Sequence, residues 1–158
     1  MGYTTDFEGF FILNKEPSAE VGRIMTGLST TRRMKRSVDE KKYGIQGEFY
    51  FGKGEFGQNE EPNIVDYNQP PDTQPGLWCH WELVHDQDCD EWFIQWDGGE
   101  KFYNYIEWLE YIIEKVLKPE GLVLQGEITW QGEDRSDMGK IEVSSNVIRI
   151  RKGTVTYR

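Results

Sequence analysis

Apolar residues recur along the chain with two spacings, and each spacing predicts a type of element. Residues 7–13 are rich in aromatic and β-branched side chains, which is typical of a strand. Four apolar residues then follow at helical spacing after Ser18, which can cap the helix that they predict. These four are Val21, Ile24, Met25 and Leu28. Residues 48–51, set between glycines, predict a second short strand.

Residues 77–84 and 91–96 predict a β-hairpin, and their apolar positions suggest its register. A register in which paired residue numbers sum to 175 puts the large apolar side chains on one face. Its pairs are Cys79 with Trp96, Trp81 with Ile94, and Leu83 with Trp92. Cys89 then lies at the hairpin tip, about 20 Å from Cys79, because each strand residue advances about 3.3 Å. We therefore expect two free thiols and no zinc site at these cysteines.

Residues 102–118 carry apolar side chains at helical spacing and predict a long helix that Pro119 and Gly121 end. Four strands are then predicted, at residues 122–131, 140–144, 147–151 and 154–157. Between residues 122–131 and 140–144, a register in which paired residue numbers sum to 271 pairs Trp130 with Ile141 and Ile128 with Val143. Between residues 140–144 and 147–151, a sum of 291 pairs Val143 with Ile148 and Ile141 with Ile150. The sequence thus predicts one α+β domain over residues 1–158, with a twisted, mainly antiparallel sheet, two helices on one face and a long polar loop at 58–76.

Charge is distributed unevenly along the 158 residues, whose net charge is −10. Residues 43–146 hold 22 acidic and six basic residues, a net charge of −16, and the remainder carries +6. The total argues against general nucleic-acid binding and against binding to anionic membranes. The basic cluster of Arg32, Arg33 and Arg36 either follows a helix C-terminus for structural reasons or forms a local phosphate site.

A candidate ligand site lies where a predicted strand leads into the long helix. Its turn contains Asp97, Gly98, Gly99, Glu100 and Lys101. Glycines before a helix leave backbone N–H groups free to face an anion, although the acidic residues of this turn can cap the helix instead. The other candidate ligand residues are Trp78, Tyr103, Asn104, Arg32, Arg33 and Arg36.

Aromatic residues also fall on the strand face opposite the predicted core. Trp78, Phe93 and Tyr103 either form an exposed binding patch or are covered by the loop at 58–76. The acidic turn at 132–137, with Glu127, offers carboxylates for metal-dependent hydrolysis only if distant loops converge. No hydrolase or metal-ligand signature is present, so we expect no metal and no cofactor.

Five segments of the chain resemble the signature blocks of a group of bacterial and bacteriophage proteins. They are residues 2–9 (GYTTDFEG), 66–71, 76–79, 96–105 (WDGGEKFYNY) and 130–134 (WQGED). The group has no established activity, so the resemblance implies a microbial or phage origin and assigns no catalytic residue.

Two functions remain open from the sequence. The first is a non-enzymatic acidic protein that binds a protein partner with a basic surface, which in a phage setting means an inhibitor of a host factor. The second is a protein that binds or hydrolyses a nucleotide or other phosphorylated ligand at residues 97–104. Because the first residues lack a basic and apolar leader pattern, we expect a cytoplasmic location.

Overall fold

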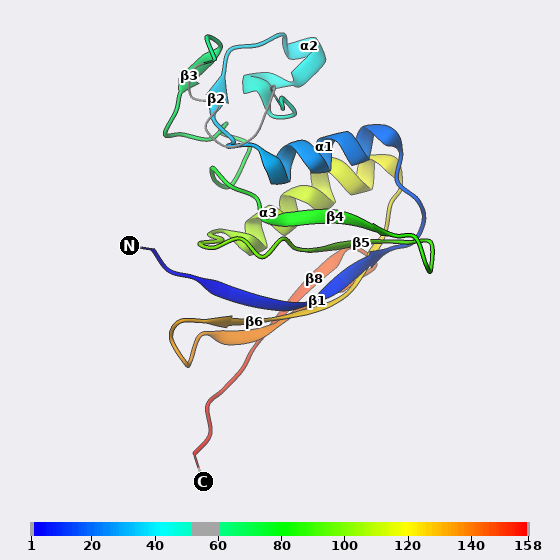
Figure 1. Ribbon diagram of the computed structural model, residues 1–158, viewed down its shortest axis with the longest axis vertical. Coiled ribbons are helices and arrows are strands. Elements are labelled where there is room, and N and C mark those ends of the chain that lie inside the picture. Colours follow the sequence, from blue (N-terminus) through cyan, green and yellow to red (C-terminus); the bar gives the residue numbers. More distant parts are fainter. Residues whose placement is uncertain (1, 52–60, 158) are drawn as a thin grey trace.

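Six antiparallel strands form one twisted sheet, and two helices pack against one of its faces (Figure 1). The computed structural model describes residues 2–51 and 61–157. In chain order, the elements are β1 (Thr5–Leu13), α1 (Ala19–Thr30), β2 (Lys35–Arg36), α2 (Glu40–Tyr43), β3 (Ile64–Asp66), β4 (Trp81–Asp86), β5 (Glu91–Trp96), α3 (Tyr105–Tyr111), β6 (Leu124–Gly132), β7 (Met138–Ser144) and β8 (Val147–Lys152). This is the predicted α+β architecture.

The sheet has the strand order β4-β5-β1-β6-β7-β8, so the first strand of the chain lies in its centre. The predicted register across the 145–146 turn is confirmed, since Val143 pairs with Ile148. Two other registers are wrong by two residues. Trp81 pairs with Trp96 in the β4–β5 hairpin, and Ile128 pairs with Ile141 between β6 and β7. A shift of two keeps every side chain on its predicted face, so the apolar pattern alone could not detect it.

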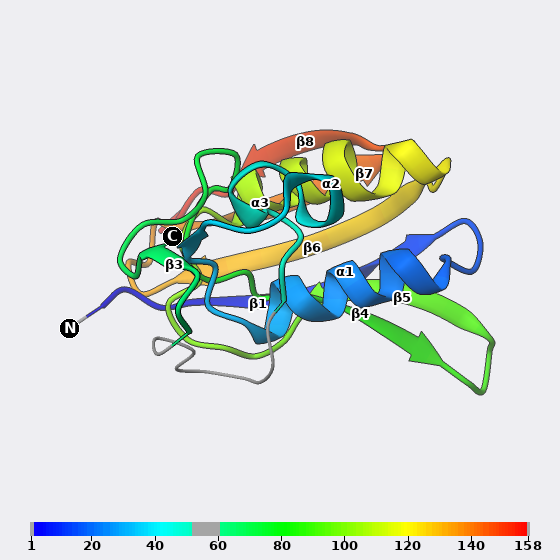
Figure 2. The ribbon, with the colours of Figure 1, turned by 90° about the horizontal axis from the view of Figure 1, so that it is seen from above.

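The two helices follow the predicted apolar spacing and cover the sheet. Ser18 caps α1 by accepting a hydrogen bond from the Val21 backbone N–H at 3.2 Å. Helix α3 continues through a π-helical segment (Ile112–Leu117) and a 3-10 turn (Lys118–Glu120), and Gly121 ends it in the left-handed conformation. Figure 2 shows α1 above the β4 side of the sheet and α3 toward the β8 side. Most of the fully buried side chains lie between these layers, among them Phe11, Met25, Trp81, Trp108, Leu109 and Ile112.

A small substructure with β2, β3 and α2 lies on the helix side of the sheet (Figure 1). Arg33 holds it together from the inside, with hydrogen bonds to Gln74 Oε1 at 3.2 Å, Thr31 Oγ1 at 2.6 Å and the Glu48 carbonyl at 2.9 Å. Tyr111 of α3 connects this substructure to the helix layer, because its hydroxyl accepts a hydrogen bond from Gln74 at 3.1 Å.

Two predicted strands are absent from the described residues. Residues 48–51 form a turn and irregular chain, since Glu48 uses its carbonyl to bind Arg33 and Gln74 and not a neighbouring strand. Residues 154–157 have no regular structure after β8 ends. The predicted loop at 58–76 contains β3 in its described part, and residues 58–60 lie outside the described residues.

The sheet face away from the helices is open along the described chain. The described part of the loop at 61–76 lies on the helix side (Figure 1), so it does not cover this face. Phe10 is 50% exposed there, and its ring centroid lies 4.6 Å from that of Phe93. The prediction that Phe93 faces away from the core is therefore confirmed. None of the described helices is long and apolar enough to cross a bilayer.

Candidate functional site

A pocket of about 580 Å³ opens at the end of the β4–β5 hairpin, beside the turn that leads into α3. Two separate stretches of chain line it. The first supplies Gly76, Leu77, Trp78 and His80, and the second supplies Gly99, Glu100, Lys101, Tyr103 and Asn104. Its volume falls within the range of pockets that bind small molecules, roughly 300–1,000 Å³. The pocket therefore joins the predicted 97–104 turn to the segment that precedes β4.

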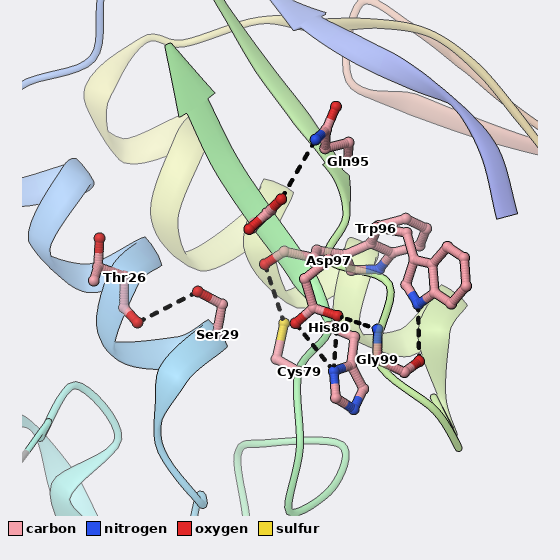
Figure 3. Close-up of polar contacts among 10 residues, drawn as sticks. Thr26, Ser29, Cys79, His80, Gln95, Trp96, Asp97 and Gly99 are labelled. Atoms are coloured by element: carbon pink, nitrogen blue, oxygen red, sulfur yellow. Dashed lines mark hydrogen bonds and ion pairs between the residues drawn. The ribbon is translucent and has the colours of Figure 1, made fainter. Parts of the chain in front are cut away.

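The centre of this site is a hydrogen-bonded pair between His80 and Asp97 (Figure 3). Both carboxylate oxygens of Asp97 lie 3.1 Å from Nδ1 of His80. The two residues are also cross-strand neighbours, because the Asp97 backbone N–H donates to the His80 carbonyl at 2.9 Å. A carboxylate only accepts hydrogen bonds, so Nδ1 is the donor of this pair, and Nε2 is the nitrogen that has the lone pair in the neutral imidazole.

The chain around His80 fixes the position of its ring. Gly99 packs directly against it, and a Cβ atom added at Gly99 would meet His80 Nδ1 at 2.4 Å. The Gly99 backbone N–H donates to Asp97 Oδ1 at 2.7 Å, and Trp96 Nε1 donates to the Gly99 carbonyl at 3.0 Å. The rings of Phe102 and His80 also meet in a T-shaped arrangement, with their centroids 5.2 Å apart. His80 is consequently 13% exposed at its side chain and held in one orientation.

The turn before α3 has an unusual backbone that aims its side chains at the pocket. Lys101 and Asn104 adopt left-handed conformations, with φ of 60° and 58°. Such values cost a non-glycine residue about 1 kcal/mol or more, and surrounding contacts must supply the compensation. Asn104 makes one such contact, since its side-chain amide donates to the Pro75 carbonyl at 2.9 Å. That bond also fastens the two pocket-lining stretches together.

The N-terminal segment closes one side of the site. The Tyr3 backbone N–H donates to the Tyr103 hydroxyl at 3.0 Å, and the Tyr3 hydroxyl donates to Asp137 Oδ2 at 2.7 Å. Trp130 Nε1 donates to the other oxygen of Asp137 at 3.0 Å. The acidic turn at 132–137 therefore uses Asp137 to fasten the chain, and within the described residues no cluster of three or more potential metal ligands occurs.

The predicted basic residues divide between the site and the fold. Arg32 lies near the pocket, because its guanidinium is 4.2 Å from the Tyr67 ring centroid and 5.8 Å from that of Trp78. Arg33 is buried in the β2–β3 substructure, and Arg36 is buried there in an ion pair with Glu61. Arg33 and Arg36 thus serve the structure and do not line the pocket. Lys101 supplies the cation of the pocket wall.

Cys79 lies directly before His80 in the chain but belongs to the core. Burial raises the pKa of its thiol to about 12, so the thiol stays protonated at neutral pH. The pocket wall contains no serine, threonine or cysteine. Its polar chemistry therefore comes from an imidazole, an ammonium group, a carboxylate, an amide and a phenol.

A second hollow, of about 630 Å³, lies on the open face of the sheet. Two of its basic groups pair with acids. Lys140 lies 3.4 Å from Glu127, and Arg151 lies 3.1 Å from Glu142. These pairs neutralise much of the charge in this hollow, so it is a weaker candidate for binding an anion.

Of the predicted ligand residues, the structure places Trp78, Gly99, Glu100, Lys101, Tyr103 and Asn104 in one pocket wall. Asp97 acts behind the wall by holding His80, and Gly98 lies beside it without lining the pocket. The predicted ligand residues do not include His80. The predicted register places it opposite Gln95, whereas the structure places it opposite Asp97. Comparison of the chain with protein-family models, with curated proteins and with solved structures found no match.

Proposed function

We propose that this protein binds a small ligand with a planar ring and an anionic or hydrogen-bond-accepting group in the pocket at residues 76–80 and 99–104. The observation that carries the proposal is the convergence of Trp78, His80, Lys101, Tyr103 and Asn104 on one concave surface. Pockets that bind small molecules are typically concave and mostly apolar, with a few placed polar groups, and this wall has that composition.

Each part of the wall suits one part of such a ligand. The faces of Trp78 and Tyr103 offer apolar area to a planar ring, and Tyr103 is 50% exposed. The Lys101 ammonium and the nearby Arg32 guanidinium favour a negatively charged group. Nucleotides and other phosphorylated aromatic compounds combine both features.

A buried donor near the pocket adds to this argument. The indole N–H of Trp108 has no acceptor within the described residues. It lies behind Gly76, where a Cβ atom would be 3.7 Å from Trp108 Nε1 and 3.3 Å from the Asn104 amide nitrogen. An unsatisfied buried N–H costs about 1–3 kcal/mol, and because Trp108 is fully buried, a ligand oxygen would pair with it only after the Gly76 segment moved aside.

A thermal-shift titration tests the proposal. The probes are adenosine, adenosine monophosphate and inorganic phosphate, which separate the ring from the anionic group. A site that takes both parts gives the largest rise in melting temperature with the monophosphate, since a ligand at 100 times its Kd stabilises by about 2.7 kcal/mol. Trp78→Leu should abolish the shift. Trp92→Leu is the matched control, because Trp92 stacks on His85 in the hairpin, away from the pocket.

Absence of a shift with these probes, and with a wider set of aromatic anions, would contradict the proposal. A shift that persists in Trp78→Leu would place the ligand elsewhere on the protein. Either result is informative because Trp78 is partly exposed, so its substitution should leave the fold intact.

A second candidate function is binding of a protein partner on the open face of the sheet. It is favoured by the exposed Phe10 ring, which packs on Phe93 beside the acidic side chains of Asp6, Glu8 and Glu91. A partner with a basic surface would then be retained on the wild-type protein and on Trp78→Leu, but lost on a Phe10→Ser, Phe93→Ser double variant.

A further inference from the structure

The His80–Asp97 pair gives the proposed ligand pocket a group that can do chemistry. We propose that His80 is a general base that activates water to hydrolyse a carboxylic ester of a planar alcohol or phenol bound in this pocket. The inference rests on the proposed function, because the same pocket must first bind the planar group.

The orientation of the imidazole is the first argument. Asp97 holds the Nδ1 side with both carboxylate oxygens at 3.1 Å, so Nδ1 donates the hydrogen bond and Nε2 is the nitrogen that has the lone pair in the neutral imidazole. Nε2 has no hydrogen-bond partner within the described residues, and Figure 3 shows it pointing away from Asp97. His80 itself forms part of the pocket wall. In the neutral imidazole, Nε2 is therefore the atom of this pocket-lining residue that can accept a proton from a bound water.

A comparison within the molecule shows why the pocket matters. His85 and Asp90 form a similar pair, with His85 Nε2 2.8 Å from Asp90 Oδ1. That pair lies at the hairpin tip, where the Asp90 side chain is 88% exposed, and neither residue lines either of the two hollows described above. Of these two pairs, the His80 pair is the one that combines a held imidazole with a pocket wall and a cation.

The proposed step balances as follows. His80 Nε2 takes a proton from water as the water oxygen attacks the carbonyl carbon, and a new carbon–oxygen bond forms. The ester carbon–oxygen bond then breaks, and the leaving alkoxide or phenolate receives the proton from Nε2. The products are a carboxylic acid and the free alcohol, and His80 returns to its initial state. The Lys101 ammonium is the group that can offset the charge on the carbonyl oxygen during the attack.

Hydrolysis of 4-methylumbelliferyl acetate tests this proposal, with binding of the planar product 4-methylumbelliferone as a separate measurement. His80→Asn should lower kcat by about 100-fold or more, the usual contribution of a general base, while binding of 4-methylumbelliferone is retained. His85→Asn is the matched control and should hydrolyse the ester like the wild type. The comparison removes background hydrolysis by surface groups, which both variants share.

Chemical rescue gives a readout that a structural role would not move. In His80→Gly, free imidazole should restore hydrolysis with a saturating dependence on its concentration, and it should do nothing for His85→Gly. Asp97 is a positioning residue, since it touches only His80 and the turn. Asp97→Asn should therefore lower kcat and leave KM unchanged.

The outcomes separate the two proposals. Retained binding of 4-methylumbelliferone with equal hydrolysis by the wild type, His80→Asn and His85→Asn overturns the catalytic inference and leaves ligand binding standing. Loss of both binding and hydrolysis in Trp78→Leu, together with His80-dependent turnover in the wild type, supports both. No binding and no turnover by the wild type, with planar probes that include the nucleotides, overturns both.

Discussion

His80 and Asp97 are paired by the same register that pairs Trp81 with Trp96 one residue further into the β4–β5 hairpin. The Asp97 backbone N–H donates to the His80 carbonyl at 2.9 Å, and the side chains of the two residues meet on the same face. The candidate site therefore extends a rigid ladder and does not depend on a long loop. Such placement gives an imidazole a fixed direction at little additional cost in conformational entropy.

Gly99→Ala should separate this pair. The new Cβ atom would lie 2.4 Å from His80 Nδ1 and 2.8 Å from Asp97 Oδ1, so the imidazole has to move away. Nitrogen-15 NMR of the imidazole should show a proton fixed on Nδ1 of His80 in the wild type and averaged ring signals in the variant. The displacement should also destabilise the fold by about 1–3 kcal/mol.

Gly98→Ala is the control for that experiment. Nothing lies within 4 Å of a Cβ atom at Gly98, although its φ of +84° makes an alanine there strained. It should lose about 1 kcal/mol of stability and keep the His80 signals of the wild type. Unchanged His80 signals in Gly99→Ala would show that the ring is not held by this contact.

Arg33→Ala should be much more destabilising than Arg32→Ala. Removal of the Arg33 guanidinium breaks its hydrogen bonds to Gln74, Thr31 and Glu48, and hydrogen bonds to a charged group contribute about 1.5–3 kcal/mol each. We expect a loss of about 3 kcal/mol or more in urea unfolding. Arg32 is partly exposed beside Tyr67 and Trp78, so its loss should cost less than about 1 kcal/mol. Equal costs would contradict the structural role of Arg33.

The sequence predicts most of the architecture because alternation and helical spacing report which face of an element is buried. It does not report register with the same strength, since a slip by two residues preserves every face. In the predicted β-hairpin, where paired residue numbers sum to 175, the last predicted pair is 84 with 91, and six residues lie between them. In the observed hairpin, four residues lie between the paired Asp86 and Glu91. A sum of 175 can also pair residues 85 and 90 with four residues between them, so loop length does not decide between the two registers.

The site was predictable only in part for a related reason. The turn at 97–101 carries local signals, and three of its residues, Gly99, Glu100 and Lys101, line the pocket. No local sequence signal predicts the interior position of Arg33, because an arginine in a basic run is ordinarily exposed. Its acceptors Gln74 and Glu48 also lie far along the chain. Contacts of that range depend on tertiary packing.

Stability should fall above pH 9 because of the buried Cys79 thiol. Burial raises its pKa from 9.0 to about 12 in the folded state, so the folded protein keeps a proton that the unfolded chain releases. The contribution of the Cys79 thiol to the free energy of unfolding is complete below pH 9 and is lost as the pH rises from 9 toward 12. At pH 10 the loss is about 1.4 kcal/mol, the equivalent of one pKa unit.

Urea unfolding of the wild type and of Cys79→Ala between pH 8 and 10 measures this effect. Cys79→Ala should flatten the decline, while Cys89→Ala, at the exposed hairpin tip, should retain most of it. The range ends at pH 10 because burial lowers the pKa of Arg33 to about 10, which adds an effect of opposite sign at higher pH. If the stability of Cys79→Ala declined as steeply over this pH range, the decline would come from titratable groups other than Cys79.

Two glycines of α1 should respond in opposite ways to alanine. Gly22 faces open space, with nothing within 4 Å of an added Cβ, so Gly22→Ala should raise stability by about 0.5–1 kcal/mol through helix propensity. At Gly27 the added Cβ would meet the Phe51 ring at 2.4 Å, so Gly27→Ala should lower stability by displacing that ring. Thermal unfolding of both variants is the measurement. A gain in stability for Gly27→Ala would show that Phe51 does not pack tightly on α1.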